Sequence, residues 1–209
     1  MGLGRVLPIL FNTDMVQAIL DGRKTVTRRI VKNCNICDGQ EINKNLQGQF
    51  ELYDITPRCG IPKGIILKPP YHPGDVLYIR ETWSEHYTAN SDGRLVYCYK
   101  ADGINLRPEC LPGETNRWYP SIHMPKGAAR IWLRVTDVRA ERLQDIDDNG
   151  ILAEGLEAGC SFGDLWNSTI KKPGRDIYSW DANPWVWVIE FERCRKPGRE
   201  WDGGHKEKI

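Results

Sequence analysis

The sequence has no long apolar run and no apolar leader. No apolar run in its 209 residues approaches the roughly 20 residues that are needed to cross a bilayer. Its start, Met-Gly-Leu-Gly-Arg, lacks the apolar segment of a secretory signal. We therefore expect a soluble cytoplasmic protein that has no membrane partner.

The net charge is close to zero, and nucleotide-binding motifs are absent from the sequence. The 29 basic and 28 acidic residues leave a net charge of +1, so any nucleic-acid binding must come from a local patch. The sequence has no Gly-x-Gly-x-x-Gly motif, no Walker loop and no His-Glu-x-x-His motif, which leaves nucleotide-driven and zincin chemistry without support. We predict no cofactor.

The seven cysteines are odd in number and irregular in spacing, which favours reduced thiols over disulfides. Cys34-x-x-Cys37, followed by Cys59, is the pattern that most resembles a zinc site, and His72 or Cys98 would have to complete four ligands. A clean second pair is missing. Thiols in a loop insertion are the alternative, and we predict no bound metal.

The composition is that of a globular chain with a sizeable core. Hydrophobic residues make up 40% and aromatic residues 10% of the sequence, including eight tryptophans that suit a dense core or a base-stacking surface. We predict a single domain over residues 1–194, with a polar, Gly/Pro/Asn-rich insertion at about 32–70 that carries one short hairpin. Residues 195–209 are charged and Gly-rich and are predicted to be a mobile tail.

Hydrophobic patterning predicts more strands than helices. Residues 130–138 alternate plainly, with Ile131 and Leu133 on a core face and Arg130 and Trp132 on the other. Many strands with non-local partners and only two or three short helices favour an α+β fold with a small mixed β-barrel. We predict strands at 5–11, 25–31, 76–83, 94–100, 130–138 and 185–192, and helices ending at Asp21, over 146–155 and around Leu165.

The strongest functional signal is a helix end followed by a cluster of cations. Asn12 is placed to cap a helix, and Gly22 stands where a left-handed residue would end it. Arg23 and Lys24 then follow the negative end of the helix dipole, and a strand leads away. A lysine, a hydroxyl and arginines are thereby focused on one small region.

The spacing Gly22-x-Lys24-x-x-Thr27-x-Arg29 at a helix-to-strand corner resembles the signature of the ASCH domain, a β-barrel relative of the PUA RNA-binding domain. The usual pattern carries Glu where this chain has Thr27. Taken together, the matches resemble the ASCH proteins of bacterial prophages and cover most of residues 7–193, outside the insertion. The further matches are Pro73-Gly74-Asp75 leading into 78–83, Pro120 to Pro125, Leu143 to Ile146 with Glu154-Gly155, and Asn183 to Trp187.

With Thr at position 27, the motif is similar to that of ASCH enzymes that hydrolyse N4-acetylcytidine to cytidine and acetate. Those enzymes have Lys and Thr at this spacing and a Glu as the third catalytic residue. The resemblance implies a triad of Lys24, Thr27 and Glu154. Thr27 would be the nucleophile and Lys24 the base, provided that burial and the neighbouring arginines lower its pKa. Glu154 would orient Lys24 or water, or protonate the leaving amine.

The alternative is a non-catalytic reader of RNA or a modified base. Lys24 and Arg29 would then bind phosphate, Glu154 would neutralise the cations, and Trp83, Trp118 and Tyr119 would either stack a base or belong to the core. His123, between Ile122 and Met124, is as well explained by a hydrogen-bonded structural role. We expect RNA or a nucleoside as the ligand and no protein partner. The candidate ligand-binding residues are Gly22, Arg23, Arg28, Arg29, Glu81, Trp83 and His123.

Overall fold

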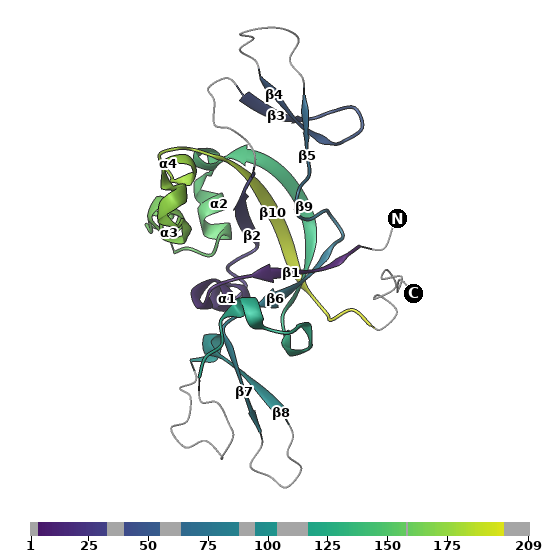
Figure 1. Cartoon of the computed structure of the whole chain (residues 1–209), viewed down its shortest axis with the longest axis vertical. Helices are drawn as coiled ribbons and strands as arrows, with labels where there is room; N and C mark the ends of the chain where they lie inside the picture. The colour runs from purple at the N-terminus through teal and green to yellow at the C-terminus, as the bar shows by residue number, and fades with distance from the viewer. Residues whose placement is uncertain are drawn as a thin grey trace. The chain divides into compact units, whose positions relative to one another are not determined.

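A computed structural model describes residues 4–32, 40–54, 64–87, 95–103, 117–157 and 159–198 (Figure 1). The chain divides into two compact units. The first contains residues 1–23, 74–134 and 192–209, and the second contains residues 24–73 and 135–191. No helix in these ranges is both long and apolar enough to cross a membrane.

The first unit is built on a parallel pair of strands. In this unit β6 lies between β1, to which it is parallel, and the start of β9, to which it is antiparallel. β7 and β8 form a separate antiparallel pair. The elements are β1 (Val6–Leu10), α1 (Thr13–Leu20), β6 (Val76–Arg80), β7 (Trp83–Tyr87), β8 (Leu95–Tyr99), the start of β9 (Trp132–Arg142) and three short 3-10 helices (Lys100–Asp102, Ser121–His123, Lys126–Ala128).

Helix α1 begins and ends as the sequence predicts. The Asn12 side chain accepts a hydrogen bond from the Met15 N–H at 2.9 Å, which satisfies a donor at the helix start. Val16 and Ile19 are buried at 0% and 1% exposure on one face. After the helix, Gly22 adopts a left-handed φ of 78°, the conformation predicted for a residue that ends a helix.

The second unit combines a β-sheet with three helices. β10 lies between β9 and β2 and is antiparallel to β2. A three-stranded antiparallel sheet has the order β3-β4-β5. The elements are β2 (Val26–Ile30), β3 (Gln40–Lys44), β4 (Phe50–Asp54), β5 (Ile65–Leu67), the rest of β9, α2 (Asp148–Ala153), α3 (Phe162–Thr169), α4 (Arg175–Tyr178), most of β10 (Trp185–Cys194) and two 3-10 helices (Leu143–Asp145, Lys172–Gly174).

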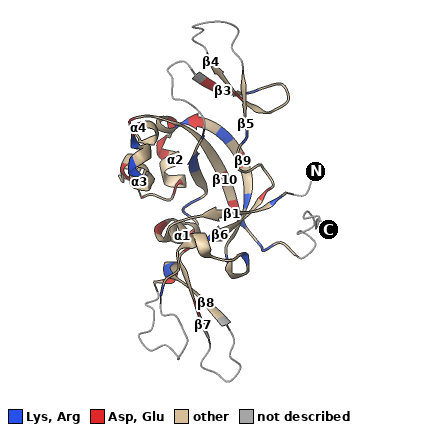
Figure 2. Ribbon diagram, in the orientation of Figure 1, with Lys and Arg blue, Asp and Glu red and all other residues tan. Residues whose placement is uncertain are grey.

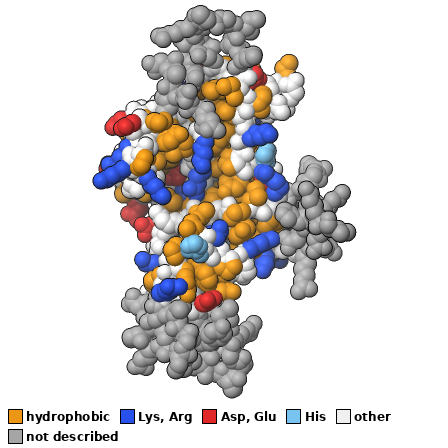
Figure 3. Space-filling model, in the orientation of Figure 1, with side chains coloured by type: hydrophobic (Ala, Val, Ile, Leu, Met, Phe, Trp, Pro, Cys, Tyr) orange, Lys and Arg blue, Asp and Glu red, His pale blue; other side chains and the backbone are white. Residues whose placement is uncertain are grey.

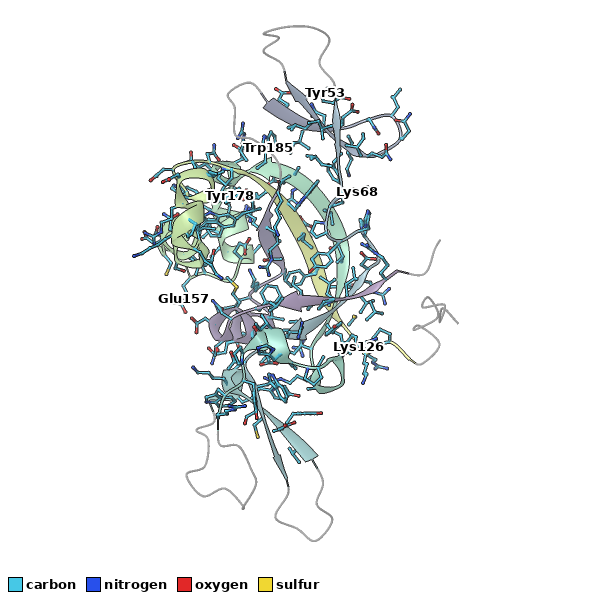
Figure 4. The ribbon with its side chains drawn as sticks, viewed as in Figure 1. Tyr53, Lys68, Lys126, Glu157, Tyr178 and Trp185 are labelled. Atoms are coloured by element: carbon cyan, nitrogen blue, oxygen red, sulfur yellow. The ribbon has the colours of Figure 1, made fainter. Side chains whose placement is uncertain are left out.

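The helices of the second unit cover one face of β2 and β10. Val26 and Val188 from the strands pack with Phe162 and Trp166 of α3 in one apolar cluster. The Trp166 Nε1 also donates to the Tyr178 backbone oxygen at 2.7 Å, which joins α3 to α4 (Figure 4). Because alternate strand residues point to opposite faces, this packing fixes the face of β2 that each side chain of the cation cluster occupies.

The α+β class is confirmed, with differences in detail. The described residues contain four α-helices, of which the four-residue α4 was not predicted, and the described part of the insertion holds three strands where one hairpin was predicted. No sheet among these residues closes into a barrel, so the PUA-like barrel stays a proposal. The single domain also stays a prediction, and most of the predicted tail, residues 199–209, lies outside the described ranges.

The alternation predicted for β9 is found, but one residue behaves differently. Ile131 and Leu133 are buried at 3% and 0% exposure. Trp132, predicted on the face opposite Ile131 and Leu133, is only 4% exposed, because its ring lies 5.9 Å from that of Tyr78 in a second apolar cluster. Both faces of the strand are therefore covered at this position.

The left-handed conformation at Gly22 gives a direct test of how the helix ends. We expect Gly22→Ala to lower the free energy of unfolding by about 1–2 kcal/mol, because a side chain strains this φ although the space around it is open. Urea denaturation measures the change. Gly127→Ala is the matched control, since that site is equally open and carries no positive φ. An equal effect of both substitutions would contradict the assignment.

Candidate functional site

The central feature of the second unit is a buried ion pair between Lys24 and Glu154. The Lys24 Nζ donates to the Glu154 Oε2 at 2.5 Å and to the Glu154 backbone oxygen at 2.9 Å, across 130 positions of sequence. The two side chains are 0% and 4% exposed. The structure thus brings together two of the three residues predicted to form a catalytic triad.

Local backbone structure places this pair. Asp147 caps α2 by accepting from the Gly150 N–H at 2.7 Å, and the helix ends with Glu154 as its C-cap. Gly155 then turns the chain with a left-handed φ of 89°. The Thr25 N–H donates to the Ala153 oxygen at 2.9 Å, so the segment before β2 runs alongside the end of α2. The last carbonyls of a helix have no intrahelical partner, and here the Glu154 carbonyl accepts a hydrogen bond from the Lys24 ammonium group.

Two arginines of β2 add positive charge to the pair. The Arg28 Nη1 lies 3.3 Å from the Glu154 Oε1, and its Nη2 lies 3.5 Å from the Glu141 Oε2. The Arg28 Nε is buried and has no hydrogen-bond partner among the described atoms. Figure 2 shows the basic stretch of β2 in blue. Three cations, counting Arg29, therefore surround one fully buried carboxylate, and Glu141 is a quarter exposed.

This environment changes the ionisation of the lysine. Burial lowers the pKa of Lys24, the Glu154 carboxylate opposes that change, and the charges of Arg29 and Arg28 add to it. Burial likewise lowers the pKa of Arg29, against the effects of Tyr71 and Glu154. A lysine with a lowered pKa can exchange a proton nearer to neutral pH than an exposed lysine can.

Thr27, the third predicted catalytic residue, is placed differently. It is 3% exposed and pairs with Ile189 of β10. Strand alternation puts it on the face of β2 opposite Arg28, together with Arg29. Within the described ranges its hydroxyl makes no hydrogen bond to Lys24 or Glu154. Thr27 is therefore next to the ion pair in sequence but not joined to it.

Gly22 and Arg23, two of the predicted ligand-binding residues, belong to the first unit. Gly22 supplies the left-handed turn after α1. The Arg23 side chain is 43% exposed, and its Nη2 lies 2.9 Å from the Asp21 Oδ2. Their observed contacts are those of a helix end.

Glu81, a further predicted site residue, is the centre of another ion-pair network in the first unit. It is 1% exposed, and its Oε1 and Oε2 accept hydrogen bonds from the Arg130 Nε and Nη2 at 3.0 and 3.1 Å. Arg130 also contacts Asp102 at 2.7 Å and lies 3.9 Å from the centre of the Tyr99 ring. Burial raises the pKa of Glu81, which Arg130 opposes, and raises the pKa of Tyr99 to about 12. These contacts leave Glu81 occupied by protein partners.

The aromatic candidates also divide between core and surface. Trp83 is 6% exposed, with ring centres of Tyr97 and Tyr119 at 5.8 and 5.1 Å. It therefore lies in the core, the alternative that sequence composition favours for a Trp-rich chain. Trp118 is half-buried, and His123 is exposed in a 3-10 helix where its backbone N–H donates to the Pro120 backbone oxygen at 3.0 Å.

The described residues offer no support for a metal site. Cys34, Cys37 and Cys59 lie outside the described residues. In the ranges that the structure does describe, no group of three or more His, Cys, Asp or Glu is arranged to hold a metal ion. The predicted cysteines stay untested candidates.

Two surface features of the second unit were not predicted. A pocket of about 410 Å³ opens at the start of α3, and none of the predicted site residues lines it; its walls come from Ile151, residues 160–164, Asn167, Trp180 and Asp181. Basic side chains also gather over the helices, shown in blue in Figure 3, where Lys171, Lys172 and Arg175 are exposed. The second feature supplies a local basic patch on a chain that has almost no net charge.

Sequence reasoning also missed two neighbours of the cation cluster. Glu141 contacts Arg28, and Tyr71 acts on Arg29. The alternating Asp137-x-Arg139-x-Glu141 is a signal for strand residues that share a face, and it stayed unused because the predicted strand ended at 138. No comparable signal marks Tyr71.

Comparison of the chain with protein-family models, with curated proteins and with solved structures finds no match. The resemblance to the ASCH family therefore depends on the motifs of the sequence alone.

The charge balance of the ion pair predicts unequal effects of removing its members. Glu154→Gln leaves Lys24, Arg28 and Arg29 without a fully buried carboxylate, and we expect a loss of about 3–5 kcal/mol in the free energy of unfolding. Lys24→Met costs less, because Arg28 still pairs with Glu154. The double variant should be less destabilised than the sum of the two, as urea denaturation can measure.

Arg23→Gln serves as the control, because it breaks an exposed ion pair and should change stability by no more than about 0.5 kcal/mol. Strict additivity of Lys24→Met and Glu154→Gln would show that the two residues do not interact.

Proposed function

We propose that this chain is an ASCH-type, PUA-like protein that binds RNA or a modified nucleoside and hydrolyses an acylated nucleobase amide such as N4-acetylcytidine. The observation that carries the proposal is the buried ion pair of Lys24 and Glu154, which come from distant segments. The motif Gly22-x-Lys24-x-x-Thr27-x-Arg29 supports the same assignment through its resemblance to the family.

Amide hydrolysis needs a nucleophile, a base and a positive environment for the oxyanion. In the proposed reaction the Thr27 oxygen bonds to the acyl carbon, its proton passes to the neutral Lys24 amine, and the carbonyl electron pair moves to oxygen. Arg29, on the same strand face as Thr27, supplies positive charge there. The tetrahedral intermediate then breaks its C–N bond, and Lys24 returns the proton to the leaving amine.

The resulting acyl-threonine ester is hydrolysed in a second step. Water adds to the acyl carbon and gives a proton to Lys24, and breaking of the ester bond releases acetate and restores the Thr27 hydroxyl as it regains that proton. Glu154 accepts a hydrogen bond from Lys24 and so fixes the position of the amine through both steps. Substrate binding must bring the Thr27 hydroxyl to the amine, because no hydrogen bond joins them within the described ranges.

A specific observation favours a second candidate, the non-catalytic reader. Thr27 lies on the strand face opposite Arg28, and its hydroxyl makes no bond to the ion pair in the described structure. In a reader, Lys24 and Glu154 would be structural. The exposed Lys171, Lys172 and Arg175 would contact the phosphate backbone.

A threonine series separates the two candidates. We expect Thr27→Val to reduce turnover of acylated nucleosides by at least about 1,000-fold, since it removes the nucleophile and keeps the shape of the side chain. Thr27→Ser retains a hydroxyl and should keep part of the activity. Incubation with a panel of acylated nucleosides, followed by chromatography of the deacylated product, measures turnover.

Thr25→Val is the matched control for this series. It lies two residues earlier in the same segment, is exposed, and should leave turnover unchanged. Nucleoside binding should survive in all three variants. Binding by the unaltered protein without turnover anywhere on the panel would favour the reader.

The lowered pKa of Lys24 predicts the pH dependence. Because the base must be neutral, kcat/KM should rise with pH through the pKa of Lys24, and the midpoint should lie below the ordinary lysine value of 10.5. A pH–rate profile with the best substrate of the panel measures it. A rate that is flat with pH, or that rises only near 10.5, would argue against Lys24 as the base.

A further inference from the structure

The Arg28 side chain is buried and contacts other protein side chains. It is 6% exposed, and its guanidinium lies 5.9 Å from the centre of the Phe162 ring. Helix α2 approaches it so closely that a Cβ added at Gly150 would lie 3.1 Å from the Arg28 Nη2. The sequence suggested a ligand-binding arginine, but this enclosure suits a residue that acts on other residues.

The residue it acts on is Glu154, whose two oxygens face different cations. The Oε2 lies 2.5 Å from the Lys24 Nζ, and the Oε1 lies 3.3 Å from the Arg28 Nη1. The second Arg28 nitrogen is held by Glu141 at 3.5 Å. The carboxylate is therefore shared between a lysine and an arginine, and Glu141 limits how far Arg28 can turn toward it.

We propose that Arg28 is a positioning residue that holds one oxygen of Glu154, so that the other oxygen faces Lys24. The inference rests on the proposed function and deepens it, because it assigns control of the base to Arg28, a residue that the motif leaves unspecified. Without Arg28, Glu154 would serve Lys24 alone and stabilise its ammonium form.

The other charged groups around Lys24 act in known directions. Glu154 favours the ammonium form, and Arg29 disfavours it together with Arg28. Tyr71 acts on Arg29, and Glu141 acts on Arg28. The Arg28 Nη1 lies 3.3 Å from the carboxylate that binds Lys24, so removal of this arginine should have a clear effect on the lysine.

The test is a titration of the Lys24 amine that does not depend on activity. Protein labelled with ¹³C and ¹⁵N at lysine is followed by NMR against pH, and the Lys24 signal is identified by its loss in Lys24→Arg. In Arg28→Gln the pKa of Lys24 should rise by about one unit or more, because a neighbouring positive charge is removed. If acylated nucleosides are turned over, the rising limb of the pH–rate profile should move to higher pH with it.

A second substitution should act in the opposite direction. Glu141→Gln removes a partly exposed carboxylate and leaves the Arg28 charge to Glu154, so the pKa of Lys24 should fall by about half a unit. This position is a quarter exposed, so the variant is expected to fold even if Arg28→Gln does not.

Arg139→Gln is the matched control, since Arg139 also bonds to Glu141 and to Glu190 but has no contact with Glu154. It should leave the Lys24 titration unchanged. An unchanged Lys24 titration in Arg28→Gln would overturn the role of Arg28. If only Glu141→Gln folds, an unchanged titration in that variant would do the same. Shifts of the same sign in both variants would also overturn it. An absence of turnover in unaltered protein with the expected titrations would instead overturn the proposed hydrolase and leave the role of Arg28 standing.

Discussion

The second unit is organised around one buried ion pair, that of Lys24 with Glu154. The pair joins the segment that enters β2 to the end of α2, across 130 positions of sequence. Burying two charges is expensive, and well-packed apolar residues in place of such a pair are often as stable or more so. Stability alone therefore does not account for a lysine and a glutamate here. The proposed role in binding or chemistry would account for them, because buried ionisable groups with a charged partner gather at functional sites.

The first unit provides a useful contrast. Glu81 is as deeply buried as Glu154, yet Arg130 contacts both of its oxygens, and the same arginine also contacts Asp102. In that network two carboxylates share one cation, so its surplus charge is negative. Around Glu154, by contrast, the cations outnumber the fully buried carboxylates, and the Arg28 Nε has no partner among the described atoms. The surplus of positive charge marks this network as the one suited to an electron-rich ligand.

Local rules predicted much of this arrangement. The cap at Asn12, the turn at Gly22 and the core face of residues 131–135 follow from capping, backbone freedom and strand alternation. The contact between Lys24 and Glu154 did not follow from spacing and came from the family resemblance, because nothing in one sequence reports which distant segments meet. Helix α4 was missed because four residues after Pro173 and Gly174 carry too little periodicity.

Other differences arose from tertiary packing. Trp132 lies on the strand face predicted to be opposite the core, but other aromatic side chains cover it. Thr27 belongs to the same motif as Lys24, but it lies on the opposite face of β2 from Arg28. Successive strand residues alternate between faces, and the motif spacing does not show on which face each one lies. Sequence motifs thus identified which residues to examine, whereas the faces they occupy depended on the packing of α2 and α3 against β2.

The central claim is that the ligand site is built around the Lys24–Glu154 pair. Its most direct test is a backbone NMR titration of ¹⁵N-labelled protein with cytidine and with N4-acetylcytidine. The amide signals of residues 24–29 and 153–155 are expected to shift most. Shifts confined to other regions, such as the pocket at residues 160–164, would contradict it.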